Sequence, residues 1–345
     1  MVGLSYIPIV LSGSPYEIGC QRGTNFRELL LTITEVTLTE KARAELLETS
    51  KHLEFVLEEK YPEFLEELHG MSDTSGLDYD DVLLLNAWWD HPTAPSLGNC
   101  SNVSLSNSDV GPIMGSTLDV GRAMGRVMTV VKPRSGYSFA DVGCRADMLG
   151  IARAINEKGL CVGSSSVPTT DRNLGFPWYI FHRVALQYCS TVDEAIDLLQ
   201  SLRPGIANTG RILFLDEKGN TAVSDVSPTK RVIMQDENGG LAATNFFTAE
   251  EMIGFDACDE RLKADSKARY KRMMDFVRSS DRSHALEEMK KLLTSHGEGA
   301  LCQHGSPEVL EAHTANITLP RTREMYVSQP IGPYCRSRFI RYRFF

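Results

Sequence analysis

The residues best suited to covalent chemistry are Cys100 and Asp119. Cys100 lies in Leu97–Ser101, where a loop of small and turn-forming residues meets the first residue of a predicted strand. Asp119 follows nineteen positions later, at the end of the strand predicted to pair with the first one. A hairpin of this length returns the chain close to its start, so the Asp119 carboxylate could accept a hydrogen bond from an amine beside the cysteine. Plainer interpretations stay open, because most cysteines are small buried hydrophobes and an aspartate often caps a turn.

Other catalytic motifs are absent from the sequence. It contains no glycine-rich phosphate or dinucleotide loop, no H-E-x-x-H, no C-x-x-C and no G-x-S-x-G nucleophile elbow. His296, Cys302 and His304 form the most metal-like cluster, but we expect them to be unrelated residues at a helix-to-strand junction, and we assign no metal site. Eight histidines leave a Cys–His pair open, although no local signature selects one of them.

The composition excludes several classes of protein. Hydrophobic residues make up 42% of the 345, which is enough for a sizeable core. The net charge is −9 and the 36 Lys and Arg are scattered, so a nucleic-acid binder is excluded. No stretch is long enough to span a bilayer, and we expect no membrane partner. Eight cysteines without a signal peptide indicate reduced thiols, and the C-terminus matches no peroxisomal signal, so we expect a cytoplasmic protein.

The secondary structure that must hold Cys100 and Asp119 is predicted to change from helices to strands near residue 95. Residues 14–91 are predicted to be helical, with a new helix beginning at Pro62, whereas the start of the chain through Leu11 is predicted to be a strand. Beyond Cys100 we expect strands at 101–106 and 113–118, hairpins around 156–159 and 216–220, helices from about 177, 191, 269 and 286, and strands in the last thirty residues. Segregated runs of this kind favour layered α+β packing over a βαβ series.

Several short motifs, taken together, carry a family resemblance. In chain order they are Tyr61–Ser72, Leu83–Trp89, Gly98–Ser101, Gly115–Asp119, Leu149–Leu160, Ser224–Pro228, Ala243–Phe246, Leu301–His304 and Gly332-Pro333. Each motif is weak alone, but their order and spacing resemble the acyl-coenzyme A:isopenicillin-N (6-aminopenicillanic acid) acyltransferase family of N-terminal nucleophile (Ntn) hydrolases. The resemblance extends over nearly the whole chain.

The resemblance implies a fold and a maturation step. The fold is a four-layer αββα sandwich of the Ntn-hydrolase type, made as an inactive precursor. Cleavage of the Asn99–Cys100 bond would give a mostly helical pro-region or small subunit, residues 1–99, and a catalytic large subunit, residues 100–345. The two fragments would stay together as one globular heterodimer, with further assembly left open.

The resemblance also implies a mechanism. Cys100 would be the nucleophile, and its new α-amine, with an ordinary pKa of about 7.7–8.0, would be the base. Asp119 would orient that amine, and the Asn245 side-chain amide would form part of an oxyanion hole. The substrate would be a small N-acyl compound or an acyl thioester in secondary metabolism. No cofactor is implied, although acyl-coenzyme A could be a co-substrate.

Three departures from the family pattern affect the prediction. Asn99 replaces the glycine often found before the scissile bond, so cleavage could be slow or absent. Ser116 and Thr117, which we take as substrate-binding candidates, stand where relatives tend to carry larger polar residues. Gln303, a third candidate, replaces an arginine, so we expect that the site has lost a fixed positive charge and takes a less anionic, or differently bound, substrate.

The sequence leaves three activities in competition. Hydrolysis and acyl transfer share the acyl-enzyme and differ only in whether water or an amine resolves it. An unprocessed cysteine amidase with a Cys–His pair is a second alternative. A catalytically silent binding protein that keeps the Ntn fold is the third, and Asn99 and Gln303 are the residues that favour it.

Overall fold

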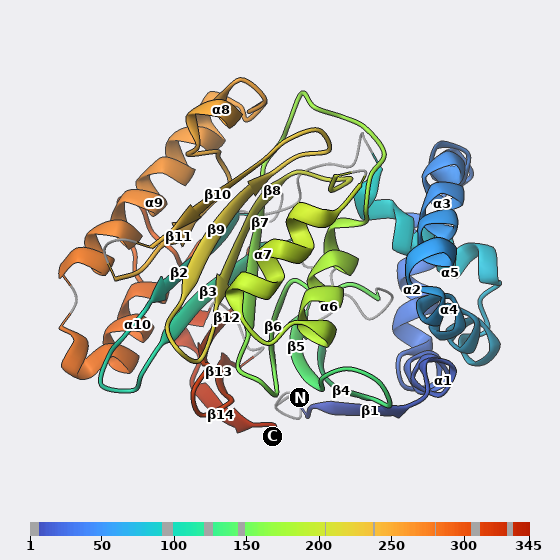
Figure 1. Ribbon diagram of the computed structural model, residues 1–345, viewed down its shortest axis with the longest axis horizontal. Helices are drawn as coiled ribbons and strands as arrows, with labels where there is room; N and C mark the ends of the chain where they lie inside the picture. The colour runs from blue at the N-terminus through green and yellow to red at the C-terminus, as the bar shows by residue number, and fades with distance from the viewer. Residues whose placement is uncertain are drawn as a thin grey trace.

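Two β-sheets packed face to face form the centre of the computed structural model, with helices on both outer faces (Figure 1). The structure describes residues 7–91, 99–120, 127–143, 149–203, 205–236, 239–279, 281–304, 311–329 and 334–345. Gly98 and Gly332-Pro333, which contribute to the family resemblance, lie outside the described residues.

The described residues form fourteen strands in two sheets, and the strands are named below in their order across each sheet. Sheet A consists of β1 (Ile9–Gly13), β4 (Val127–Pro133), β5 (Phe139–Gly143), β6 (Arg153–Asn156), β7 (Cys161–Ser166), β8 (Gly210–Leu215), β9 (Thr221–Val226) and β10 (Arg231–Gln235). Sheet B consists of β11 (Ala242–Ala243), β2 (Asn99–Leu105), β3 (Ile113–Val120), β12 (Glu311–Leu319), β13 (Glu324–Ser328) and β14 (Phe339–Arg343). β1 runs parallel to β4, and the other described pairings are antiparallel.

The helices begin where the sequence provides the expected signals. They are α1 (Pro15–Asn25), α2 (Arg27–Thr37), α3 (Glu40–Lys60), α4 (Pro62–Ser75), α5 (Tyr79–Ala87), α6 (Trp178–Tyr188), α7 (Val192–Ser201), α8 (Glu250–Ile253), α9 (Glu260–Ser279) and α10 (Ala285–Leu293). Pro62 occupies the first turn of α4, where a missing N–H costs nothing, and the Thr191 side chain caps α7 by accepting from the Glu194 N–H. The predicted helical region and the helix start at Pro62 are therefore confirmed.

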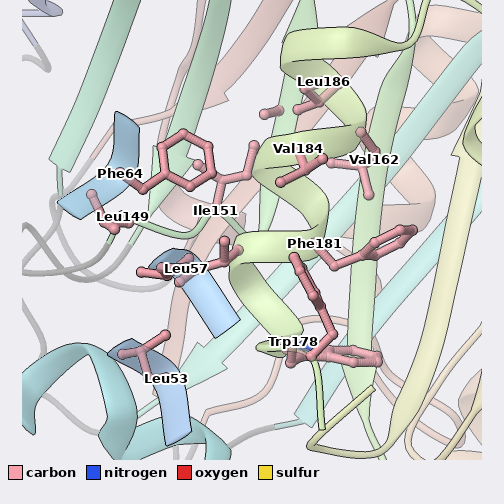
Figure 2. Packing of buried hydrophobic residues seen from close by; sticks show 14 of the residues in the cluster. Leu53, Leu57, Phe64, Leu149, Ile151, Val162, Trp178, Phe181, Val184 and Leu186 are labelled. Atoms are coloured by element: carbon pink, nitrogen blue, oxygen red, sulfur yellow. The ribbon is translucent and has the colours of Figure 1, made fainter. Parts of the chain in front are cut away.

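Among the described residues, three of the four clusters of buried hydrophobic residues separate the layers. One joins α1–α7 to the outer face of sheet A; its members include Leu57, Phe64 and Phe181 (Figure 2). A second, which contains Met114 and Met128, lies between the sheets, and a third joins sheet B to α9 and α10. Each sheet thus buries both faces, which gives the order helices, sheet A, sheet B, helices.

The helices α1–α5 extend this sandwich sideways, beyond α6 (Figure 1). Glu67 of α4 anchors them: it is fully buried and pairs with Arg183 of α6 at 2.8 Å and Arg22 of α1 at 3.4 Å. Burial alone would raise the pKa of Glu67, but the two guanidiniums outweigh it and hold the pKa below its ordinary value. None of the described helices is long and apolar enough to cross a membrane.

Candidate active site

Cys100 is the second residue of β2, and β3 lies antiparallel beside it. Asn99 is paired with Asp119 and Cys100 with Leu118, so the hairpin brings the predicted residues together as the sequence indicates. Successive side chains alternate between the two faces of a strand. The alternation places the Cys100 thiol toward sheet A, whereas Asn99, Ser101 and Asp119 face α9 and α10.

Contacts on either side of β2 agree with this alternation. On the thiol's side, Asn102 Nδ2 donates to Ser165 Oγ of β7 at 2.9 Å. On the other side, Ser101 Oγ accepts a hydrogen bond from Arg269 of α9 at 2.9 Å. The close approach of the sheets requires Gly163, because a Cβ there would lie 2.4 Å from Asn102 Oδ1. Cys100 itself is only 6% exposed.

Asn245 holds the backbone nitrogen of Cys100. It follows β11, which pairs with β2, and its side chain is fully buried. Asn245 Oδ1 accepts from the Cys100 N–H at 2.9 Å, and its Nδ2 donates to the Ser166 carbonyl at the end of β7 at 2.8 Å. The side-chain amide is therefore fixed at both ends, with its oxygen toward the Cys100 nitrogen.

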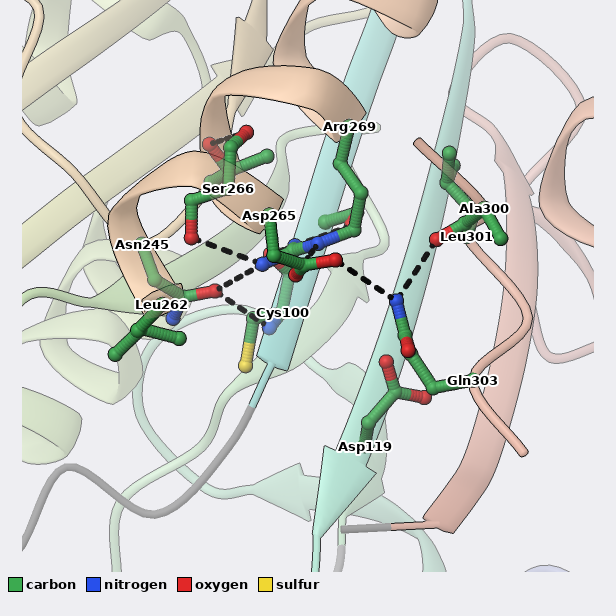
Figure 3. Close-up of polar contacts among 12 residues, drawn as sticks. Cys100, Asp119, Asn245, Leu262, Asp265, Ser266, Arg269, Ala300, Leu301 and Gln303 are labelled. Carbon is green, nitrogen blue, oxygen red and sulfur yellow. Dashed lines mark hydrogen bonds and ion pairs between the residues drawn. The ribbon is translucent and has the colours of Figure 1, made fainter. Parts of the chain in front are cut away.

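Arg269 is the residue of this site that the sequence analysis missed. It is fully buried, and its five N–H donors match five contacts (Figure 3). The acceptors are the Cys100 carbonyl at 2.8 Å, Ser101 Oγ at 2.9 Å, Asn245 Oδ1 at 3.2 Å, Ser266 Oγ at 3.0 Å and Asp265 Oδ2 at 2.8 Å. One signal could have found it: Arg269 precedes Met273 and Val277 at four-residue spacing, so an arginine stands on the apolar face of a helix.

Gln303 reaches the same cluster through Asp265. Its Nε2 donates to the Ala300 carbonyl at 2.9 Å and to Asp265 Oδ1 at 3.5 Å, and Asp265 is the ion-pair partner of Arg269. The expectation that Gln303 leaves the site without a positive charge for a substrate carboxylate stays a prediction, although Arg269 brings a guanidinium to the same cluster from α9. That guanidinium is committed to protein acceptors, so it is not free to anchor a substrate carboxylate.

Asp119 is fully buried beside the Asn99–Cys100 bond. Its Oδ1 accepts from the Tyr334 hydroxyl at 3.3 Å, and its Oδ2 has no partner among the described residues. Burial raises the pKa of Asp119 well above its ordinary value, although the charges of Arg269 and Arg153 and the Tyr334 hydrogen bond oppose this. A cationic group placed beside Asp119 would restore the ionised carboxylate.

The structure separates the two small residues of β3. Ser116 is paired with Asn102 on the thiol's side of the sheet, and its buried Oγ has no partner among the described residues. Thr117 is paired with Ser101 and lies on the α9 side, as Gln303 does. Of the three substrate-binding candidates, Ser116 is the one on the face that carries the Cys100 thiol.

Known proteins resemble this chain in structure or in sequence. A variant of the conjugated bile acid hydrolase from Clostridium perfringens superposes with a TM-score of 0.53 at 13% identity, covering 71% of this chain and 97% of the hydrolase. Penicillin V acylase from Agrobacterium tumefaciens gives a TM-score of 0.45 at 15% identity, over 68% of this chain and 84% of the acylase. An uncharacterized protein of Archaeoglobus fulgidus is 25% identical over 234 residues, 57% of this chain; the match spans 39% of that protein's length.

The expected fold class, an α+β sandwich of the Ntn-hydrolase type, is confirmed by the superposition on the bile acid hydrolase and by the two helix-covered sheets. The model of the acyl-coenzyme A:6-aminopenicillanic acid acyl-transferase family matches residues 106–310, more than half of the chain. The matched part contains Asp119, Asn245, Arg269 and Gln303 and begins six residues after Cys100. The chain therefore belongs to the acyl-coenzyme A:6-aminopenicillanic acid acyl-transferase family.

Proposed function

We propose that this protein is a self-cleaving cysteine amidohydrolase or acyltransferase of the Ntn type, with Cys100 as its nucleophile. The observation that carries the proposal is the hydrogen bond from the Cys100 N–H to Asn245 Oδ1. A side chain so placed would hold the same nitrogen after cleavage of the Asn99–Cys100 bond, when it becomes an α-amine.

The base in this proposal is that α-amine. Near neutral pH a free α-amino group exists partly as the neutral amine, so it can take the thiol proton. Asp119 supports the arrangement because its Oδ2 is buried next to the Asn99–Cys100 bond and has no partner among the described residues. An ammonium formed on Cys100 would give that carboxylate a counter-charge, and the carboxylate would in turn favour the protonated amine after proton transfer.

The described histidine contacts do not favour a Cys–His pair. The rings of His52, His91 and His182 contact the carbonyls of residues 175, 45 and 151. His296 and His304 contact each other, and His304 also contacts Cys302 and Cys335. Each of these rings thus has a partner other than Cys100, which supports the α-amine as the base.

The reaction follows from these assignments. The thiolate adds to an amide or thioester carbonyl, and the bond to the leaving amine or thiol breaks as that group takes the proton from the α-ammonium. An acyl-thioester on Cys100 remains. Water then releases a carboxylic acid, or an acceptor amine forms a new amide, and the thiol is restored. We propose small N-acyl compounds as substrates and acyl-coenzyme A as a candidate acyl donor.

Substrate charge is a further part of the proposal. Because the donors of Arg269 are all committed, we expect no fixed guanidinium to select a substrate carboxylate through this residue. Matched N-acyl substrates with a free carboxylate and with its methyl ester should then have similar kcat/KM values. A strong preference for the carboxylate would show that another cation binds it.

The proposal is tested by acyl-enzyme trapping with Cys100→Ala beside wild type. Wild type incubated with N-acyl amides and acyl-coenzyme A thioesters should acquire the acyl mass on the peptide that begins at Cys100. Cys100→Ala should acquire none, whereas Cys20→Ser, a matched change of a half-buried thiol in α1, should behave as wild type. Turnover retained in Cys100→Ala would end the proposal.

A further inference from the structure

Four potential metal ligands meet at one corner of the site described above. His296 Nε2, Cys302 Sγ, His304 Nε2 and Cys335 Sγ all lie within 4.8 Å of one another. Three of them follow α10 in a short segment, and the fourth comes from the turn Tyr334–Arg336, 31 residues beyond His304. On the sequence alone, the first three residues are expected to be unrelated. Cys335 could not be added to them, because only the fold brings it close to the other three.

The contacts within this cluster converge on one atom. His304 Nε2 lies 3.0 Å from His296 Nε2, 3.5 Å from Cys302 Sγ and 3.2 Å from Cys335 Sγ. A neutral imidazole nitrogen either carries one proton or offers one lone pair, so it cannot hydrogen-bond to three neighbours at once. Hydrogen bonding therefore does not account for the arrangement.

A tetrahedral ion does account for it. Zinc binds cysteine sulfur at about 2.3 Å and histidine nitrogen at about 2.0–2.1 Å, which places neighbouring ligand atoms about 3.3–3.8 Å apart in a tetrahedron. The three separations of 3.0, 3.2 and 3.5 Å fall close to this range, and the other pairs stay within 4.8 Å. Two imidazoles and two thiolates are the donor set that favours zinc over harder ions such as Mg²⁺ or Ca²⁺.

Backbone contacts position two of the ligands, His296 and Cys302, without a metal. The Cys302 N–H donates to the Ser295 carbonyl at 3.2 Å, which closes the loop that carries His296 back to Cys302. Gly297 and Gly299 have φ values of +86° and +65°, a backbone conformation that residues with a side chain rarely adopt. Glycine at these positions therefore allows the tight turn between His296 and Cys302. Arg272 of α9 fixes the other end by donating to the His296 carbonyl at 3.1 Å.

We propose that His296, Cys302, His304 and Cys335 bind one structural zinc ion. On binding, the two thiols release their protons to solvent, so two thiolates neutralise the charge of Zn²⁺ and both imidazoles stay neutral. Four protein ligands complete the tetrahedron and leave no open position for a substrate or water. The ion is therefore structural rather than catalytic.

The ligands flank residues that hold the Cys100 cluster in place. Cys302 lies between Leu301, whose carbonyl accepts from the Tyr334 hydroxyl, and Gln303, which contacts Asp265. Cys335 directly follows Tyr334, the partner of Asp119. A zinc ion would thus join the two segments that position Tyr334 and Gln303, and its loss would loosen one wall of the site.

The test measures metal in the full-length protein, independently of activity. Protein expressed with zinc in the medium and dialysed against a weak chelator should retain about one zinc per chain by elemental mass spectrometry. Replacement by Co²⁺ should give the intense visible absorption of a tetrahedral site and a thiolate-to-cobalt charge-transfer band. Cys335→Ser and His296→Gln should lose most of the retained zinc, and Cys335→Ser should weaken the charge-transfer band; Cys20→Ser should change neither.

Three results would overturn the proposal. One is wild-type protein that retains almost no zinc after dialysis, a result that does not depend on whether any variant folds. Another is zinc retained equally by Cys335→Ser and wild type, which would place the ion elsewhere. The third is a Cys302–Cys335 disulfide in metal-free folded protein, found by peptide mapping without reductant, which would make the pair a covalent crosslink instead.

Discussion

The proposed chemistry of Cys100 depends on the position of its backbone nitrogen. The family resemblance assigns the Asn245 amide to an oxyanion hole and Asp119 to the new amine. In the uncleaved chain, Asn245 presents its oxygen to the Cys100 N–H and gives its Nδ2 to Ser166. The Asn245 side chain is thus positioned against the nucleophile by two hydrogen bonds, and its function in the oxyanion hole stays a prediction.

Replacing Asn245 by Ala should therefore reduce turnover. Loss of one preorganised polar group at a reacting centre typically costs about a hundred- to a thousandfold in kcat. The measurement is kcat and KM for an N-acyl substrate, with Asn25→Ala, an exposed asparagine at the end of α1, as the control. A kcat within a few-fold of wild type would remove Asn245 from the site.

Asp119 should make the stability of the uncleaved protein depend on pH. The pKa of Asp119 is raised in the native state, so the native state resists its ionisation. The contribution of Asp119 to the free energy of unfolding is therefore complete below the ordinary carboxylate pKa and is lost as pH rises through the native pKa. Asp119→Asn removes the titration. In a Cys100→Ala background, which prevents cleavage, the free energy of unfolding of Asp119→Asn relative to its parent should increase from pH 5 to pH 8. Urea titrations measure this difference, and a difference that is constant or falls with pH would contradict the assignment.

At the scale of elements, the site depends on the docking of α9 against β2. Arg269 makes that contact with its whole guanidinium, from the Cys100 carbonyl to Asp265. An arginine so buried is stable only when its donors are satisfied, and the strand edge beside Cys100 supplies the acceptors. The residue that contacts Cys100 therefore also holds α9 against β2.

Arg269→Met, compared with Arg269→Lys, should separate the effect of the Arg269 hydrogen bonds from the effect of its positive charge. It leaves several buried acceptors without donors, which predicts a loss of about 3 kcal/mol or more in the free energy of unfolding. Arg269→Lys keeps the charge but satisfies fewer acceptors, so its stability and its kcat should lie between those of Met and wild type. Arg278→Met, at an exposed position of the same helix, is the control. Equal stability of all four proteins would contradict the docking role.

Glu67 predicts a second effect at this scale, on the docking of α4 against α6. Removing the carboxylate in Glu67→Gln leaves two buried guanidiniums poorly paired, and breaking such a pair typically costs about 3–5 kcal/mol. Because the pKa of Glu67 is lowered in the native state, its contribution is complete above the ordinary carboxylate pKa and disappears as pH falls through the native value. The gap in unfolding free energy between wild type and Glu67→Gln should thus narrow in acid, whereas Glu66→Gln, on the exposed side of α4, should follow wild type at every pH.

The sequence predicted the elements better than the contacts between them. Hydrophobic periodicity, Pro62 and the turn-rich segments identify the helices and hairpins, because those signals are local. The β2–β3 hairpin could be predicted for the same reason, and with it the approach of Asp119 to Cys100. Arg269 contacts Cys100 across more than 150 positions, and Cys335 contacts His304 across more than 30. No local sequence pattern encodes contacts between residues so far apart in the chain.

Over the whole molecule, the expected boundary at Cys100 divides a single folded unit. β1, before the boundary, pairs with β4, and Glu67 binds Arg183 across it. The largest core includes residues from both sides, such as Phe64 and Phe181. Residues 1–99 thus supply a sheet edge and a helical layer that the remainder does not replace.

Cleaved protein should accordingly remain one particle. On a native sizing column, fragments 1–99 and 100–345 should co-elute and separate only in denaturant, since the interface resembles a domain core. Analysis of each peak by denaturing gel gives the composition. Release of the 1–99 fragment in native buffer would contradict the continuous core.

Denaturing intact-mass spectrometry of fresh protein shows whether Cys100 becomes an N-terminal nucleophile. Wild type should give two fragments, residues 1–99 and 100–345, and Cys100→Ala should give a single 38.3 kDa chain. A single 38.3 kDa species from catalytically active wild type would rule out the proposed mechanism, because the α-amine that serves as the base would not exist.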